Sequence, residues 1–287
     1  MFHLYADDTQ LYLSFVPGEN VNTVTSRIEA CVKDIKHWMA QNFLKLNEEK
    51  TELILIGSKR QQEKVNLPQL HFGESRIEPT IAVRNLGVIF DTHMSLNSHV
   101  QSIVKSAYFH LRNVARVKRY LSYRTTQLLV QSVVTSRLDM CNSLLTGLPS
   151  VLLDKLQLVQ NNAARVISGT KKHDHITPVL RDLHWLPVRQ RIIYKVCLLT
   201  FRALHGLAPQ YIEELVSLYQ PTRALRSQSQ HLLVEPTVNL VTFGSRSFSS
   251  AAPAMWNQLP LSVKKCETLT LFKAQLKTHL FREAYSV

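Results

Sequence analysis

The chain has 287 residues and is strongly basic, with 34 lysines and arginines against 21 aspartates and glutamates, a net charge of +13. Hydrophobic residues make up 45% of the chain, which excludes a mostly disordered protein, and eight glycines favour helices over a turn-rich β-sandwich. The length allows one large domain or two smaller ones. The excess of base indicates an acidic partner, either nucleic acid or an anionic membrane surface.

The four cysteines predict neither a disulfide framework nor a zinc site. They lie dozens of residues apart and form no CxxC pair, so we expect buried free thiols and no disulfide-linked partner. No apolar run approaches the roughly 18 residues of a membrane span, and the first residues do not resemble a signal peptide. We therefore expect an intracellular protein, nuclear or cytoplasmic or both, without a membrane partner.

The first ninety residues alternate strand and helix patterns. β-Favouring runs at 3–5 and 11–15 flank a polar segment, which predicts a hairpin with Asp7 and Asp8 at its tip. Apolar residues at helical spacing predict a helix over 21–39. Two short apolar runs, at 53–57 and 86–91, predict buried strands.

From residue 97 onward the pattern is almost entirely helical. One predicted helix carries an apolar stripe at i, i+4, i+7, i+11 and i+14, formed by Val100, Val104, Ala107, Leu111 and Val114. A second stripe, roughly 130° around the same helix at ~100° per residue, holds the cations Lys105, Arg112, Arg116 and Arg119. A helix that buries one flank and exposes a row of cations on another is suited to lie along a phosphate backbone. The same residues are also compatible with a solvated basic surface.

Further helices are expected towards the C-terminus, over 125–145, 150–169, from 177, over 187–206 and over 268–285, from apolar periodicity and from proline and glycine positions. Residues 220–262 are rich in Ser, Gln, Pro, Thr and Arg. We expect extended structure and loops in that stretch.

The adjacent carboxylates of Asp7 and Asp8 suit metal-dependent chemistry. Both can approach a divalent cation, and nucleotidyl transfer needs such oxygen ligands. Taken alone, an Asp-Asp pair is also an ordinary turn sequence, because Asp is a common turn former.

Several motifs together resemble the reverse transcriptases of LINE-type (non-LTR, jockey-like) retrotransposons. Residues 5–12 (YADDTQLY) are similar to the YADD box of that family. Five further segments resemble later palm motifs of that family: Trp38-Met39, 42–47 (NFLKLN), 50–52 (KTE), 86–91 (LGVIFD) and Met94-Ser95. Four segments resemble the region that the family carries after the palm: 136–139 (SRLD), 156–157 (LQ), 161–165 (NNAAR) and 183–187 (LHWLP). The resemblance spans nearly the whole chain.

The resemblance implies a role for each matching residue. Asp7, with Asp8 as its less essential neighbour, would be the catalytic metal ligand for Mg²⁺, or Mn²⁺ in its place. Tyr5 would lie beside the primer terminus, Lys50 near the nucleotide phosphates, and Gly87 would allow the backbone to approach the primer. The cation row would lie where polymerases place the thumb and would contact an RNA template, a DNA primer or their duplex.

The implied fold is α+β, with a partial polymerase palm over 1–95, a helical, basic, thumb-like region over 96–206 and a C-terminal region over 207–287 with loops and a final helix. The resemblance further implies that the fingers and the first catalytic aspartate would precede Met1. We therefore expect a fragment of an RNA-directed DNA polymerase that works by two-metal nucleotidyl transfer in its intact parent and is inactive alone. The alternatives are a non-enzymatic RNA- or DNA-binding helical protein and a non-functional retrotransposon relic.

Overall fold

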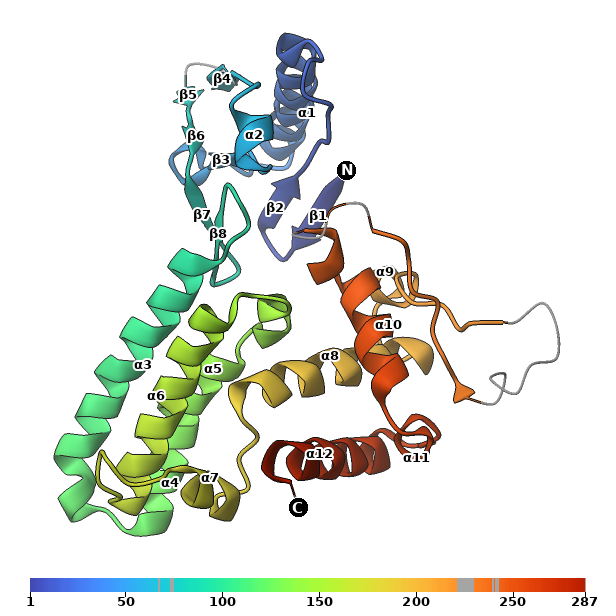
Figure 1. Ribbon diagram of the computed structural model, residues 1–287. Coiled ribbons are helices and arrows are strands. Elements are labelled where there is room, and N and C mark those ends of the chain that lie inside the picture. The colour runs from blue at the N-terminus through green and yellow to red at the C-terminus, as the bar shows by residue number, and fades with distance from the viewer. Residues whose placement is uncertain (67, 73–74, 221–229, 239, 241–242, 287) are drawn as a thin grey trace. The chain divides into compact units, whose positions relative to one another are not determined.

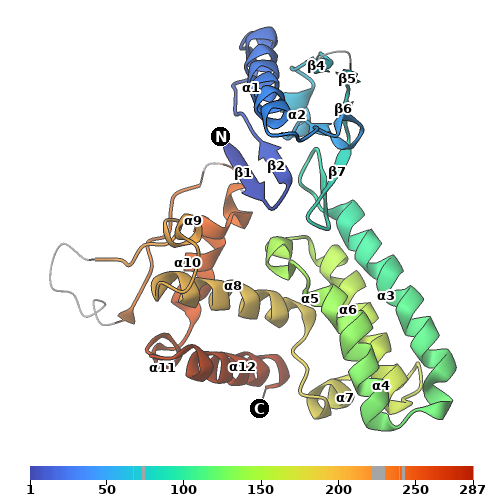
Figure 2. The ribbon, with the colours of Figure 1, turned by 180° about the vertical axis from the view of Figure 1, so that it is seen from behind.

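The computed structural model describes residues 1–66, 68–72, 75–220, 230–238, 240 and 243–286 (Figures 1 and 2). The chain is an α+β protein, as predicted, and it divides into two compact units, Met1–His99 and Val100–Val287. The regions that the sequence separates at residue 206 belong to one unit. Each unit is described by itself.

The strands of the first unit form four two-stranded sheets within the described residues. Three pairs are antiparallel: β1 (Phe2–Tyr5) with β2 (Asp8–Leu11), β4 (Leu70–Phe72) with β5 (Ser75–Ile77), and β7 (Ala82–Asn85) with β8 (Val88–Asp91). One pair is parallel: β3 (Leu53–Ile54) with β6 (Pro79–Thr80). The helical elements of this unit are α1 (Val21–Gln41), the 3₁₀ turn Glu48–Lys50 and α2 (Lys59–Gln62).

The hydrophobic core of the first unit is small. One cluster consists of the buried Val32, Leu70 and Ile77, against which a few half-buried side chains from α1, β2 and β3 pack. The other buried hydrophobic residues described in this unit are Val24, Val88 and Leu96. Every side chain of β1 is exposed, including Phe2 at 67%. The prediction of a buried strand at 53–57 is therefore wrong in its burial, because both residues of β3 are only half-buried.

The second unit is helical. Its first helix, α3 (Asn97–Val117), begins at the end of the first unit and is followed by the 3₁₀ turn Lys118–Tyr120. The other helices are α4 (Tyr123–Val130), α5 (Ser136–Asp139), α6 (Ser150–Ser168), α7 (Thr177–Asp182), α8 (Val188–Leu204), α9 (Gln210–Glu213), α10 (Phe248–Gln258), α11 (Leu261–Lys264) and α12 (Leu269–Tyr285). Helices α4 and α5 are joined by a π-helical turn, Gln131–Thr135. Both views show α3 and α6 side by side (Figures 1 and 2). Helix α8 packs against α10 and α12.

Two helical predictions for this unit need correction. The helix expected over 125–145 ends at Asp139, because Met140 is extended and Cys141 adopts a left-handed φ of 51°. Part of the stretch 220–262, where extended structure and loops are expected, is instead helix α10, which contains Pro253 in its interior. Burial of Trp256, which is 1% exposed, outweighs the hydrogen bond that this proline removes. Residues 221–229 lie outside the described residues.

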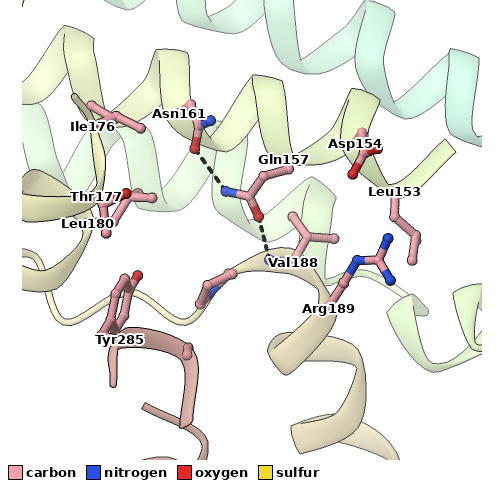
Figure 3. A pocket seen from close by; sticks show the side chains of 12 residues that line it. Leu153, Asp154, Gln157, Asn161, Ile176, Thr177, Leu180, Val188, Arg189 and Tyr285 are labelled. Carbon is pink, nitrogen blue, oxygen red and sulfur yellow. Dashed lines mark hydrogen bonds between the residues drawn. The ribbon is translucent and has the colours of Figure 1, made fainter. Parts of the chain in front are cut away.

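A short segment without helix or strand structure, Trp185–Pro187, is tied to α6 by two glutamines. The Nε2 atom of Gln160 donates to the Leu186 carbonyl at 2.9 Å, and the Val188 N–H donates to Oε1 of Gln157 at 2.8 Å. Gln157 also donates to Asn161 of the same helix at 2.8 Å, and both side chains line a cavity of about 300 Å³ (Figure 3). These bonds satisfy backbone groups that neither a helix nor a strand satisfies.

The same segment is held from the other side by α8 and α12. Nε of Arg191 donates to the Leu186 carbonyl at 3.0 Å, and its guanidinium pairs with Asp139 at 2.6 Å. The hydroxyl of Tyr285 donates to the Trp185 carbonyl at 2.6 Å. Three helices, α6, α8 and α12, therefore meet at one irregular strip of backbone, and α5 is linked to it through Arg191.

We expect Tyr285→Phe to lower the free energy of unfolding of the second unit by about 1–2 kcal/mol, because the Trp185 carbonyl would lose its donor. Urea denaturation followed by circular dichroism measures the change. The matched control is Tyr123→Phe, which removes the same hydroxyl from a side chain that is 56% exposed. Equal stability of the two variants would contradict a stabilising role of the hydrogen bond between Tyr285 and the Trp185 carbonyl.

This hydroxyl also predicts a pH dependence. Burial raises the pKa of Tyr285 to about 12, although the charge of Arg191 acts to lower it. Because a tyrosine in the unfolded chain ionises near 10, the folded state keeps a proton that the unfolded state has lost. The contribution of Tyr285 to stability is therefore complete below pH 10 and falls as pH rises from there through the folded pKa. Tyr285→Phe should lack this component of the loss.

Candidate nucleic-acid interface

The first hairpin places the two candidate metal ligands at its turn. Tyr5 pairs with Asp8, which leaves Ala6 and Asp7 as the two-residue loop. Ala6 adopts a φ of 53°, the positive value that tight hairpin loops require and that glycine accepts most easily. The predicted hairpin is present, with Asp7 in the turn and Asp8 at the start of β2. Its second strand is Asp8–Leu11 and not 11–15 as predicted, because the loop has two residues in place of the expected polar segment.

Asp7 and Asp8 are both exposed to solvent. Within the described residues, no group of three or more His, Cys, Asp or Glu side chains could hold a metal ion. Mg²⁺ favours near-octahedral oxygen sites and gives up its water reluctantly. Two exposed carboxylates alone therefore do not complete a site that fits Mg²⁺ or Mn²⁺.

The structure brings a second candidate hairpin against the first. Nε2 of Gln10, on β2, donates to Oδ1 of Asn85, on β7, at 2.9 Å. Asn85 is the last residue of β7, directly before the loop that contains Gly87. Tyr5, Asp7 and Gly87 therefore belong to two hairpins joined by a side-chain hydrogen bond.

Gly87 has a structural explanation that needs no primer. Leu86 and Gly87 form the two-residue loop between β7 and β8, with φ values of 45° and 84°. Positive φ at both positions is the type I′ geometry, in which glycine is preferred second. The prediction of one buried strand over 86–91 is wrong for this reason, since its first two residues are a turn and only Val88 of β8 is buried.

Lys50 and Tyr5 are exposed, and Tyr5 remains 65% accessible beside Asp8. Lys50 ends the 3₁₀ turn Glu48–Lys50, where its backbone N–H is capped by Oδ1 of Asn47 at 3.3 Å. The side chains of Tyr5 and Lys50 are thus available to a ligand, but they arise from separate elements.

Asp91 is a carboxylate with a structural role. It accepts hydrogen bonds from the backbone N–H groups of His93, Ser95 and Leu96 and from the Ser95 hydroxyl. Burial acts to raise the pKa of Asp91, but these bonds outweigh it and lower the pKa. Asp91 therefore holds the turn that leads into α3, in which Leu96 adopts a φ of 56°.

The cation row is exposed along α3 and past its end. Lys105, Arg112 and Arg116 lie on α3, whereas Arg119 lies in the 3₁₀ turn that follows, because the helix ends at Val117. All four side chains are exposed, and none is paired with a carboxylate among the described residues. The predicted apolar stripe is buried on the other flank, apart from the half-buried Val104.

Two aromatic residues beside the cation row escaped the sequence reasoning. Tyr120 is 74% exposed and Tyr123 is 56% exposed, and the guanidinium carbon of Arg119 lies 4.7 Å from the centre of the Tyr120 ring. The available signal was the interleaving of tyrosines and arginines over 119–124. By contrast, Arg137, which lies in the same stretch without acidic residues between Asp91 and Asp139, is half-buried and donates to Ser106 at 3.0 Å.

We expect Gly87→Ala to destabilise the first unit by about 1 kcal/mol, because a Cβ at a φ of 84° is strained. Gly57→Ala is the matched control, since Gly57 has no positive φ and a Cβ there meets its neighbours at 3.6 Å or more. Thermal unfolding of both variants without nucleic acid measures the difference. A stable Gly87→Ala variant would show that the turn does not require this glycine.

Within the described residues every helix is too short or too polar to span a bilayer. All four cysteines are free thiols, but the prediction that they are buried is wrong for Cys31 and Cys141, which are exposed. Burial raises the pKa of Cys197 to about 12.

Compared with known proteins, the chain matches no family model, no curated protein and no solved structure.

Proposed function

We propose that this chain binds nucleic acid without sequence preference through the cation row, and that it derives from the palm and thumb of a non-LTR retrotransposon reverse transcriptase. The observation that carries the binding proposal is the set of four exposed, unpaired cations on α3 and the turn after it. Surface cations without carboxylate partners add little to the stability of the fold. An anionic ligand best explains why these positive charges lie together on the surface.

The dimensions of the row suit a polynucleotide. Lys105 and Arg116 are eleven residues apart, which corresponds to roughly 16 Å along a helix axis. Phosphates of one strand of a duplex follow each other at about 3.4 Å along the axis, so the row covers about five of them. Its contacts would go to phosphates and would carry no base information.

The polymerase ancestry rests on the order of the motifs and is supported by the joined hairpins of the first unit. In an intact parent enzyme Asp7 and Asp8 would contribute to the magnesium site, and Tyr5, Lys50 and Gly87 would lie around primer and nucleotide. In this chain the two carboxylates lack further ligands among the described residues. The small core of the first unit favours the relic interpretation for that unit, whereas the second unit has a large core of its own.

The binding proposal is tested by replacing Arg112, Arg116 and Arg119 with Gln. Each lost phosphate contact should reduce the slope of log affinity against log salt by about 0.9, because fewer counterions are released on binding. Fluorescence anisotropy with an RNA–DNA duplex at several salt concentrations measures the slope.

The control variant carries Gln at Lys265, Lys273 and Lys277, three exposed cations on and near α12. It has the same net charge as the triple arginine variant, so it separates a local contact from a general charge effect. Equal slopes for the two variants, or an unchanged slope in the arginine variant, would sink the proposal.

We expect the purified chain not to extend a DNA primer on an RNA template in the presence of Mg²⁺, because two exposed carboxylates do not complete the metal site. A gel assay for primer extension, with an active reverse transcriptase as positive control, measures this. Extension that Asp7→Ala abolishes would overturn the expectation.

A further inference from the structure

The connection between α3 and α4 exposes two tyrosine rings at one end of the second unit. We call this surface the tyrosine turn and define it by Arg116, Arg119, Tyr120, Tyr123 and Arg124. All five side chains are exposed, with 74% of Tyr120 and 56% of Tyr123 accessible. Large apolar rings at such exposure gain nothing from the fold, and together they mark an interaction surface.

Arg119 orients the first ring. Its guanidinium carbon lies 4.7 Å from the centre of Tyr120, which is the stacked geometry of a cation–π contact. One face of the ring is therefore occupied by a cation, and the high exposure leaves the opposite face open. A planar group can stack there without moving Arg119.

The surroundings of the two rings are cationic. The sequence has no acidic residue between Asp91 and Asp139, and none of the three arginines of the tyrosine turn pairs with a carboxylate among the described residues. Lys118 differs, because it is half-buried and its amino group lies at the carbonyl end of α6. Its Nζ would be 3.6 Å from a Cβ added to Gly169, the residue that ends that helix. The dipole of α6 accounts for Lys118, so it is not counted in the surface.

Aromatic faces beside unpaired arginines fit the bases and phosphates of an unpaired strand. Base stacking on aromatic side chains and arginine contacts to the backbone are the two features of sequence-tolerant single-strand binding. A duplex hides its base faces in the stack, so it can use only the arginines. Three residues of chain span at most about 10 Å, so Tyr120 and Tyr123 lie within reach of neighbouring nucleotides.

We propose that the tyrosine turn binds single-stranded nucleic acid by stacking bases on Tyr120 and Tyr123, so that a strand leaving a duplex on the cation row is held at its unpaired end. This inference extends the proposed function, because Arg116 and Arg119 also belong to the row. The ligand chemistry is an unpaired base next to a phosphate, which both RNA and DNA supply.

The test uses the full chain and four labelled probes: a short unstructured RNA, a DNA of the same sequence, a blunt RNA–DNA duplex and the same duplex with a single-stranded overhang. Tyr120→Leu combined with Tyr123→Leu should weaken binding to both single strands by about tenfold or more and change blunt-duplex binding less than twofold. The overhang should increase the affinity of the wild-type chain and not that of the double variant. RNA and DNA should respond alike, and a loss confined to RNA would indicate 2′-hydroxyl contacts in place of stacking.

Tyr120→Phe combined with Tyr123→Phe keeps both rings and should bind as the wild type does, which separates stacking from hydroxyl contacts. Tyr211→Leu is the matched control, since Tyr211 on α9 is 55% exposed and lies outside the tyrosine turn. Thermal unfolding verifies that the exposed substitutions leave the fold intact.

Three results would overturn the inference: unchanged single-strand affinity in the Leu variant, an equal loss for the blunt duplex, or the same loss in the Phe variant. Failure of the proposed function looks different, because then the blunt duplex shows no salt-dependent binding in the wild type while the single strands still report on the tyrosines. If no probe binds, both proposals are wrong.

Discussion

The carbonyl groups of Trp185 and Leu186 lie in the interior of the second unit, where neither a helix nor a strand satisfies them. The side chains of the two residues are 4% and 5% exposed, so water cannot replace missing donors. Gln160, Arg191 and Tyr285 donate to these carbonyls from α6, α8 and α12. Two adjacent carbonyls therefore tie α6, α8 and α12 to one strip of backbone: Leu186 accepts from α6 and α8, and Trp185 accepts from α12.

Among its described residues, the first unit shows no comparable set of hydrogen bonds to one strip of backbone. A small cluster of Val32, Leu70 and Ile77 holds α1 against β4 and β5, and the hairpins depend on turn geometry and on the bond between Gln10 and Asn85. Isolated two-stranded hairpins are marginal in water. Asp7 and Asp8 therefore lie on a scaffold with little burial behind it, whereas the cations of α3 lie on a helix packed along its length. Metal-dependent catalysis needs ligands held within fractions of an ångström, which the hairpin of the first unit does not provide. Electrostatic attraction of phosphates needs no such precision, so the packed helix α3 is sufficient for it.

Local sequence signals predicted the elements whose causes are local. The apolar period of α3, Gly169 after α6 and Thr268 before α12 each mark a boundary or a face that the structure contains. Features with tertiary causes were not predictable. Helix α10 tolerates Pro253 because Trp256 is buried against α12, and the end of α3 at Val117 moves Arg119 into a turn. The site followed the same division. Asp7, Asp8 and the cation row could be found from residue type and spacing, but the exposure of Tyr120 could not.

The motifs of the chain differ in how far structure alone explains them. Asp139 pairs with Arg191, Gln157 satisfies the start of α8, and Asp91 caps the turn before α3. Each of these residues resembles part of a polymerase motif, yet each has hydrogen-bond partners that account for its presence. The cations of α3 and the turn differ, since they are exposed and lack carboxylate partners among the described residues. A residue whose contacts explain it says little about ligands, whereas exposed charge without a carboxylate partner calls for another explanation. The proposed nucleic-acid ligand is therefore expected on the α3 side of the second unit.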